Sequence, residues 1–183
     1  MKTISLLLLL VSATSYLSAQ ETRRETAHVS ANPADDKRPN SAGVPDVSVY
    51  ESRIDRIVIL RFRFGTDLLA GLKSTIQNQG IRNALILSGF GSVRNFQVHQ
   101  VSNRDLPSKD TYVKDPSAPA DIVGMSGMVM NGRVHAHMTL ANADKAFGGH
   151  LEPDTNVFTF AVITLGVLDD KLDLGRIDDA NNR

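Results

Sequence analysis

Apolar residues that alternate with polar ones at the period of a β-strand dominate this sequence and limit the folds that it can adopt. Between Arg53 and Phe64, for example, Leu60 and Phe62 alternate with arginines, a pattern typical of a half-buried strand. The other segments with strand character are Ala84–Leu87, Val93–Val101, Ile122–Met130, Arg133–Ala141 and Asn156–Leu168. Asn131-Gly132 joins two of them and is a strong hairpin signal. The sequence therefore predicts at least six strands.

One helix is predicted after the first strand. Thr66 is suited to cap its N-terminus, and Gly80 is suited to end it. The apolar residues between them share one helical face: Leu68, Leu69, Leu72 and Ile76. The predicted class is therefore α+β, with a mixed or antiparallel twisted sheet around one main helix. Gly89–Ser92 is interpreted as a turn, and residues 105–120 as a long Pro-rich loop.

The length of 183 residues and a hydrophobic content of 42% favour one domain. We expect it to span residues 47–170. Residues 20–46 are polar, contain three prolines and show no apolar period, as in a disordered linker. Residues 171–183 are expected to form a frayed tail.

The first nineteen residues have the pattern of an export signal. Lys2 precedes the apolar run Ile4–Val11, and Ser18-Ala19 offers small residues at a cleavage site. The alternative, a membrane anchor, is disfavoured because a bilayer span needs about 20 apolar residues. The chain is therefore expected to be exported, to the periplasm or outside the cell, without a stable membrane anchor.

Composition excludes several classes of site. The 20 basic and 20 acidic residues cancel, so no overall field attracts nucleic acid or anionic lipid. The chain has no cysteine, which excludes disulfides, thiolate catalysis and sulfur ligands to a metal. A metal would have to be held by histidine, aspartate or glutamate.

Three histidines have spacing that suits a metal. His135 and His137 are two residues apart on a predicted strand and so face the same side, while His150 follows two flexible glycines, Gly148 and Gly149. Three neutral imidazoles with a vacant position resemble the zinc sites of hydrolases and lyases. Alternatively, the histidines are ordinary polar-face residues and the glycines make a turn. His99 has no spaced partner and is interpreted as structural.

Several short motifs occur together in an order that resembles the plants-and-prokaryotes-conserved (PPC) domain family. They are Arg61-x-Arg63-x-Gly65-x-Asp67-Leu68, Gly80-Ile81 leading to Gly89-x-Gly91-Ser92, His135-x-His137, and Gly148-Gly149-His150-Leu151. The resemblance implies a compact α+β subunit that assembles as a homotrimer. The fold is also similar to that of acetolactate decarboxylase, whose zinc is held by histidines in a comparable pattern.

The chain departs from this family in two places. It lacks the Arg-Gly-Arg-Pro hook with which plant members bind AT-rich DNA, and Ala161 stands where many relatives carry a glutamate. The first departure disfavours DNA binding. The second disfavours any site that would use that carboxylate.

Three functions compete at this stage. The leading hypothesis is an exported trimer that binds zinc or another divalent metal through His135, His137 and His150. The second is a metal-dependent lyase or hydrolase for a small oxo-acid or ester, with Arg63 or Arg133 as anion clamps and Glu152 as proton carrier. The third, a DNA-binding regulator, is opposed by the neutral charge, the missing hook and the export signal.

Overall fold

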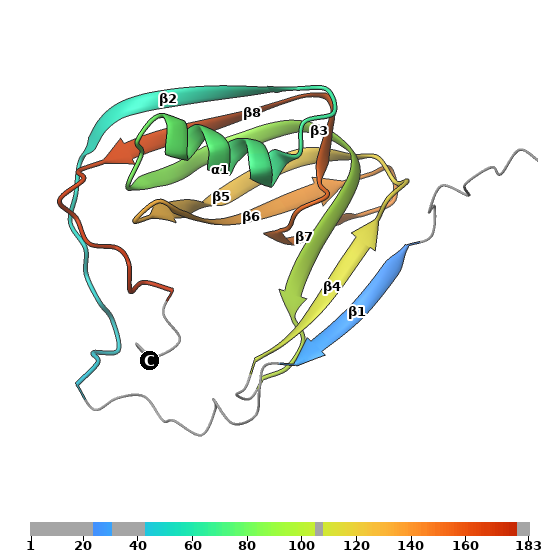
Figure 1. Cartoon of the computed structure of the whole chain (residues 1–183). Coiled ribbons are helices and arrows are strands. Elements are labelled where there is room, and N and C mark those ends of the chain that lie inside the picture. Colours follow the sequence, from blue (N-terminus) through green and yellow to red (C-terminus); the bar gives the residue numbers. More distant parts are fainter. Residues whose placement is uncertain (1–23, 31–42, 105–107, 179–183) are drawn as a thin grey trace, which may run out of the picture.

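The computed structural model describes residues 24–30, 43–104 and 108–178. Within these residues, eight antiparallel strands and one helix form the fold (Figure 1). The elements are β1 (Glu25–Ser30), β2 (Ile54–Arg63), α1 (Leu68–Asn78), β3 (Ala84–Val101), β4 (Lys109–Asp115), β5 (Ala120–Met130), β6 (Arg133–Ala141), β7 (Ala146–Leu151) and β8 (Asn156–Leu168). The predicted α+β class is confirmed. The predicted export signal lies outside the described residues.

The long strand β3 connects the two parts of the sheet. Its first half pairs with β5 and β8, and its second half pairs with β4 and β7. In Figure 1, the second half of β3 curves away from the layer that α1 covers. β4 pairs with this half, and β1 pairs with β4. The prediction of a turn at Gly89–Ser92 was wrong, because these residues continue β3. A Cβ on Gly91 would collide with the carbonyl oxygen of Phe160, so the glycine permits close strand approach.

Helix α1 packs one apolar face onto the sheet. Asp67 is its N-cap, since its Oδ1 accepts a hydrogen bond from the Ala70 amide at 2.8 Å. The cap is therefore one residue later than the predicted Thr66. Gly80 follows the helix at φ +60°, a conformation that glycine adopts without strain. The buried helix residues are the four predicted: Leu68, Leu69, Leu72 and Ile76.

Three strands were not predicted from the sequence. β1 lies in the segment expected to be a disordered linker, and β4 lies in the segment expected to be a loop. β7 contains Gly148 and Gly149, which were expected to form a turn. The Asn131-Gly132 hairpin is confirmed, with φ of 49° and 80° at its two residues.

The segment after β8 packs against the sheet as far as it is described, so the expected fraying does not occur there. Leu174 is only 1% exposed and lies in a small apolar cluster with Met130 and Leu168. The fully buried Asn83 donates from Nδ2 to the carbonyl oxygen of Leu172 at 2.7 Å. Buried hydrogen bonds of this kind fix the path of the segment.

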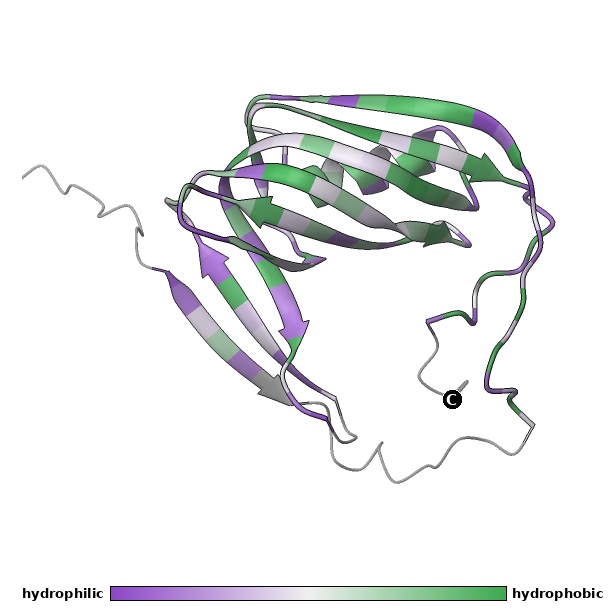
Figure 2. Cartoon of the chain, turned by 180° about the vertical axis from the view of Figure 1, so that it is seen from behind, coloured by the Kyte–Doolittle hydropathy of each residue, from purple (hydrophilic) through white to green (hydrophobic). Residues whose placement is uncertain are grey.

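The sheet face away from α1 carries exposed apolar side chains. On β2, Ile57 and Ile59 are exposed, whereas the alternate residue Phe62 lies in the core. Phe90 and Phe160 contact each other edge to face, with centroids 6.3 Å apart. We call the following residues the outer apolar patch: Ile57, Ile59, Leu87, Phe90 and Phe160. Figure 2, seen from behind the view of Figure 1, shows the hydrophobic segments of these strands.

Candidate metal centre

Four of the five histidines meet where β3, β7 and β6 lie side by side. His150 on β7 pairs with His137 on β6 and with His99 on β3. Directly paired residues on neighbouring strands project from the same face of a sheet. His135, two residues before His137, shares that face. We call His99, His135, His137 and His150 the histidine cluster.

His135 and His137 face each other closely. Their Nε2 atoms are 3.2 Å apart, and their rings are stacked with centroids 5.2 Å apart. Two nitrogens bound to one tetrahedral zinc ion are separated by about 3.4 Å, because each lies about 2.1 Å from the metal. The pair therefore has a separation that suits one ion.

His150 meets this pair edge-on. Its ring centroid is 4.9 Å from that of His135 and 5.4 Å from that of His137, at interplanar angles of 84° and 80°. Its Nδ1 is buried and forms no hydrogen bond within the described part of the chain. A buried nitrogen without a hydrogen bond is costly, and the carboxylate of Glu152, 3.5 Å away, is placed to attract an N–H at this position.

The glycines before His150 explain how β7 fits between its neighbours. A Cβ on Gly148 would collide with the carbonyl oxygen of Met138 on β6, and a Cβ on Gly149 would collide with that of His99 on β3. The two glycines therefore position His150 by letting three backbones pack closely, and not by making a turn.

Glu152 lies beside two of the histidines. Its Oε1 is 2.6 Å from Nδ1 of His99 and 3.5 Å from Nδ1 of His150. The rings of His99 and His150 are stacked at 4.5 Å. His99, which has no partner at a regular spacing in the sequence, gains these neighbours because β3 pairs with β7. The ligand atoms of His99, His150 and Glu152 all lie within 4.8 Å of one another, so they form a second set able to hold a metal.

The C-terminal segment supplies another carboxylate. Asp178 places Oδ1 2.7 Å from Nη2 of Arg133 and Oδ2 3.6 Å from Nδ1 of His135. Arg133 therefore reaches the edge of the histidine cluster through Asp178. Arg63, the other proposed anion clamp, lies on β2, which pairs with β8. Neither strand carries a histidine.

Burial and mutual repulsion keep part of the cluster neutral. Burial is the largest cause that lowers the pKa of His137, followed by the charges of His135 and His99. Burial also lowers the pKa of His150, and His99 and His135 add to the effect, while Glu152 opposes it. Neutral imidazole is the form that binds a metal.

A hollow of about 450 Å³ opens beside His137. It is lined partly by Ser126 and Thr139, and by glycines that include Gly124 and Gly148. Thr139 pairs with Gly124 on one side and with Gly148 on the other, so no side chain fills the space there. The hollow leaves room for a small molecule next to the cluster.

Comparison with known proteins identifies the family. The profile of the Plants and Prokaryotes Conserved domain, abbreviated PCC or PPC, matches residues 49–169. The chain belongs to this family. The PPC domain thus includes α1, strands β2 to β8 and every member of the histidine cluster. Ala161, one of the two departures from the family pattern noted in the sequence, is fully buried in the core of this domain.

Solved structures share the fold. A metal-containing protein from Archaeoglobus fulgidus is 25% identical, with a TM-score of 0.56 over 66% of this chain and 86% of its own. A PPC protein from Pyrococcus horikoshii is 22% identical, with a TM-score of 0.54 over 66% and 85%. A protein from Bacteroides thetaiotaomicron that is provisionally described as DNA-binding is 18% identical, with a TM-score of 0.52 over 66% of this chain and 85% of its own. None of the curated proteins matches this sequence.

Proposed function

We propose that this protein is an exported PPC-domain trimer whose function depends on a bound divalent metal, with zinc as the ion. His135, His137 and His150 would hold the metal. The observation that carries the proposal is the meeting of these three rings, with the Nε2 atoms of His135 and His137 3.2 Å apart and the ring of His150 edge-on to both.

The neighbouring carboxylates fit this assignment. Glu152 faces Nδ1 of His150, and Asp178 faces Nδ1 of His135. Histidines that bind a metal commonly direct their other ring nitrogen to a carboxylate, which fixes the orientation of the ring. With Nδ1 of each ring facing a carboxylate, Nε2 is the atom left for the metal.

Two further observations support a metal site. The related Archaeoglobus protein is described as metal-containing. In addition, His150 Nδ1 is a buried nitrogen without a hydrogen bond, and a metal on the opposite nitrogen would strengthen the attraction of this N–H to Glu152. The chemistry of the donors, imidazole with flanking carboxylate, is that of zinc sites.

The trimer is supported by the outer apolar patch. An exposed apolar area on a sheet face is typical of a protein–protein contact, and the patch lies on the face that α1 leaves open. The part of the chain that the structure describes contains no helix that is long and apolar enough to span a bilayer. The proposal of export rests on the pattern of residues 1–19.

An enzyme is the second candidate, because of the hollow beside His137. A zinc ion with a vacant position polarises a carbonyl or acidifies bound water. In such an enzyme, a small oxo-acid or ester would occupy the hollow. Glu152, next to His99 and His150, would hold or move a proton.

DNA binding is a weaker candidate. A relative from Bacteroides is provisionally described as DNA-binding, but at 18% identity it shares the fold alone. The 20 basic and 20 acidic residues of this chain leave no excess of cations for phosphate neutralisation.

Zinc content tests the proposal. The protein, purified without chelator, dialysed against zinc and analysed by mass spectrometry for metals, should hold one zinc per chain. His137→Ala and His150→Ala should each remove it, since three ligands act as a unit. His28→Ala is the matched control, because His28 lies on β1 and contacts Thr111. Wild-type protein without zinc, or variants that retain it, would overturn the proposal.

A further inference from the structure

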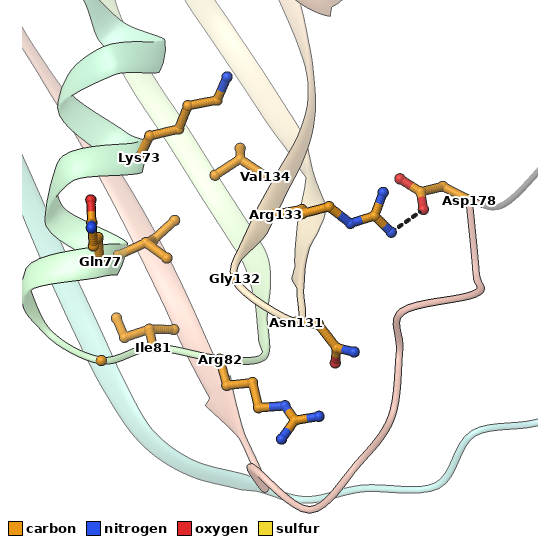
Figure 3. Close-up of a pocket in the computed structure, with 11 residues that line it drawn as sticks. Lys73, Gln77, Ile81, Arg82, Asn131, Gly132, Arg133, Val134 and Asp178 are labelled. Atoms are coloured by element: carbon orange, nitrogen blue, oxygen red, sulfur yellow. Dashed lines mark hydrogen bonds and ion pairs between the residues drawn. The ribbon is translucent and has the colours of Figure 1, made fainter.

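The segment that follows β8 leads to the edge of the histidine cluster. The family profile ends at residue 169, so residues 170–178, which we call the C-terminal strap, lie beyond the matched region. Figure 3 shows Asp178, at the end of the strap, and Arg133, at the start of β6, directed toward each other. The strap therefore brings a carboxylate to a site whose histidines all belong to the matched region.

Two asparagines fix the strap to the sheet. The buried Asn83 donates to the carbonyl oxygen of Leu172 at 2.7 Å. Asn131 donates from Nδ2 to Asp173 Oδ1 at 2.8 Å, and its Oδ1 accepts a hydrogen bond from the Leu174 amide at 3.4 Å. These bonds, together with the buried side chain of Leu174, define the path of the strap before it reaches Asp178.

Arg133 holds the end of the strap. Its Nη2 donates to Asp178 Oδ1 at 2.7 Å and to the carbonyl oxygen of Gly175 at 2.9 Å. The side chain of Asp178 is only 23% exposed, although it lies near the end of the chain. A hydrogen bond between two charged groups is stronger than one between neutral groups. The pair therefore restrains the orientation of the carboxylate.

The second oxygen of this carboxylate faces the histidine cluster. Asp178 Oδ2 lies 3.6 Å from Nδ1 of His135, whereas Nε2 of the same ring lies 3.2 Å from Nε2 of His137. A carboxylate beside one ring nitrogen favours the tautomer that carries its proton on that nitrogen. The lone pair of His135 is then on Nε2, on the side of His137.

We infer that Arg133 and Asp178 are positioning residues for the metal. Arg133 orients Asp178, and Asp178 keeps His135 as the Nδ1–H tautomer with Nε2 directed to the ion. The inference rests on the proposed metal site and adds to it a segment beyond the matched family domain. If Asp178 and Arg133 only attached the strap to the sheet, their loss would lower stability without changing the tautomer of His135 or the affinity for zinc.

The tautomer of His135 tests the inference without metal. Long-range proton–nitrogen NMR spectra of the metal-free, labelled full chain at pH 7.5 show which ring nitrogen carries the proton. His135 should be the Nδ1–H tautomer in the wild type and should lose this preference in Asp178→Ala and in Arg133→Gln. Asp144→Ala, at an exposed acid between β6 and β7, is the matched control. A wild-type Nε2–H tautomer, or an unchanged tautomer in both variants, would overturn the inference even if the protein binds zinc.

Zinc affinity tests the same residues at the loaded site. In a competition titration with a chelating dye, Asp178→Ala should weaken zinc binding by about 10–100-fold. Arg133→Gln should also weaken it but should add little to Asp178→Ala, because Arg133 acts through that carboxylate. Arg56→Gln, at an exposed cation on β2, should leave the affinity unchanged.

The outcomes separate this inference from the proposed function. If both single variants bind zinc as tightly as the wild type, or if their effects add in full, the inference fails while the metal site stands. A wild type that binds no zinc would overturn the proposed function and the inference with it.

Discussion

At the scale of single residues, His150 connects the parts of the site. It pairs with His99 on one side and with His137 on the other, and its Nδ1 lies 3.5 Å from Glu152. Burial and neighbouring charge disfavour protonation of His137 and His150. The folded protein therefore favours the neutral form of these two imidazoles, which is the form that binds a metal.

This preference predicts how the stability of the metal-free protein depends on pH. The pKa values of His137 and His150 are lower in the folded than in the unfolded chain, so the unfolded chain binds more protons once the pH falls below about 6.5. The contribution of these residues to the free energy of unfolding is complete above that pH and is lost as the pH falls through their folded-state values. Urea unfolding with chelator present should therefore show lower stability at pH 5.5 than at pH 7.5.

Substitutions test whether His137 and His150, and not other groups, cause this pH dependence of stability. The double substitution His137→Ala with His150→Ala should reduce the pH dependence, whereas His28→Ala should leave it unchanged. Equal stability at both pH values in the wild type, or an unchanged dependence in the double variant, would show that the fold does not keep His137 and His150 neutral.

Much of the candidate site could be predicted from local spacing. His135 and His137 are two residues apart on a strand, and the structure places them face to face. His99 and Asp178 could not be found in this way, because their neighbours come from strand pairing and from the packing of the C-terminal segment. Such contacts depend on the register between distant segments, which no short motif records.

At the scale of elements, the position of His150 depends on how closely β7 packs between β6 and β3. Gly149→Ala should destabilise the protein by about 1–3 kcal/mol, because a Cβ there would collide with the backbone of His99 and the strands would have to separate. Thermal or urea unfolding measures the loss. Gly124→Ala is the matched control, since a Cβ at Gly124 meets nothing within 4 Å. Similar stability of the two variants would contradict this account of β7.

The same elements show why sequence patterns missed part of the sheet. β6 and the first part of β8 have one buried face, and the bounds of both strands agree with the prediction. β4, by contrast, has partly buried residues at nearly every position and many polar side chains, so it shows no alternation. In β3 and β7 the glycines permit close packing, although glycine more often marks a turn in a sequence.

At the scale of the whole molecule, the outer apolar patch predicts how copies associate. Ile59 is 69% exposed in the single chain, so Ile59→Glu should leave the fold intact but place a charge in the contact between subunits. Light scattering should show a trimer for the wild type and a monomer for the variant. Ser74→Glu, on the exposed side of α1, should remain trimeric. A wild-type monomer at micromolar concentration would contradict the proposed assembly.

The location of the metal tests the central claim most directly. Crystals of the zinc-loaded protein, measured at the zinc absorption edge, should give one anomalous peak per chain. The account predicts that this peak lies about 2.1 Å from one nitrogen each of His135, His137 and His150. A peak bound instead by His99, His150 and Glu152, or no peak in the histidine cluster, would contradict it.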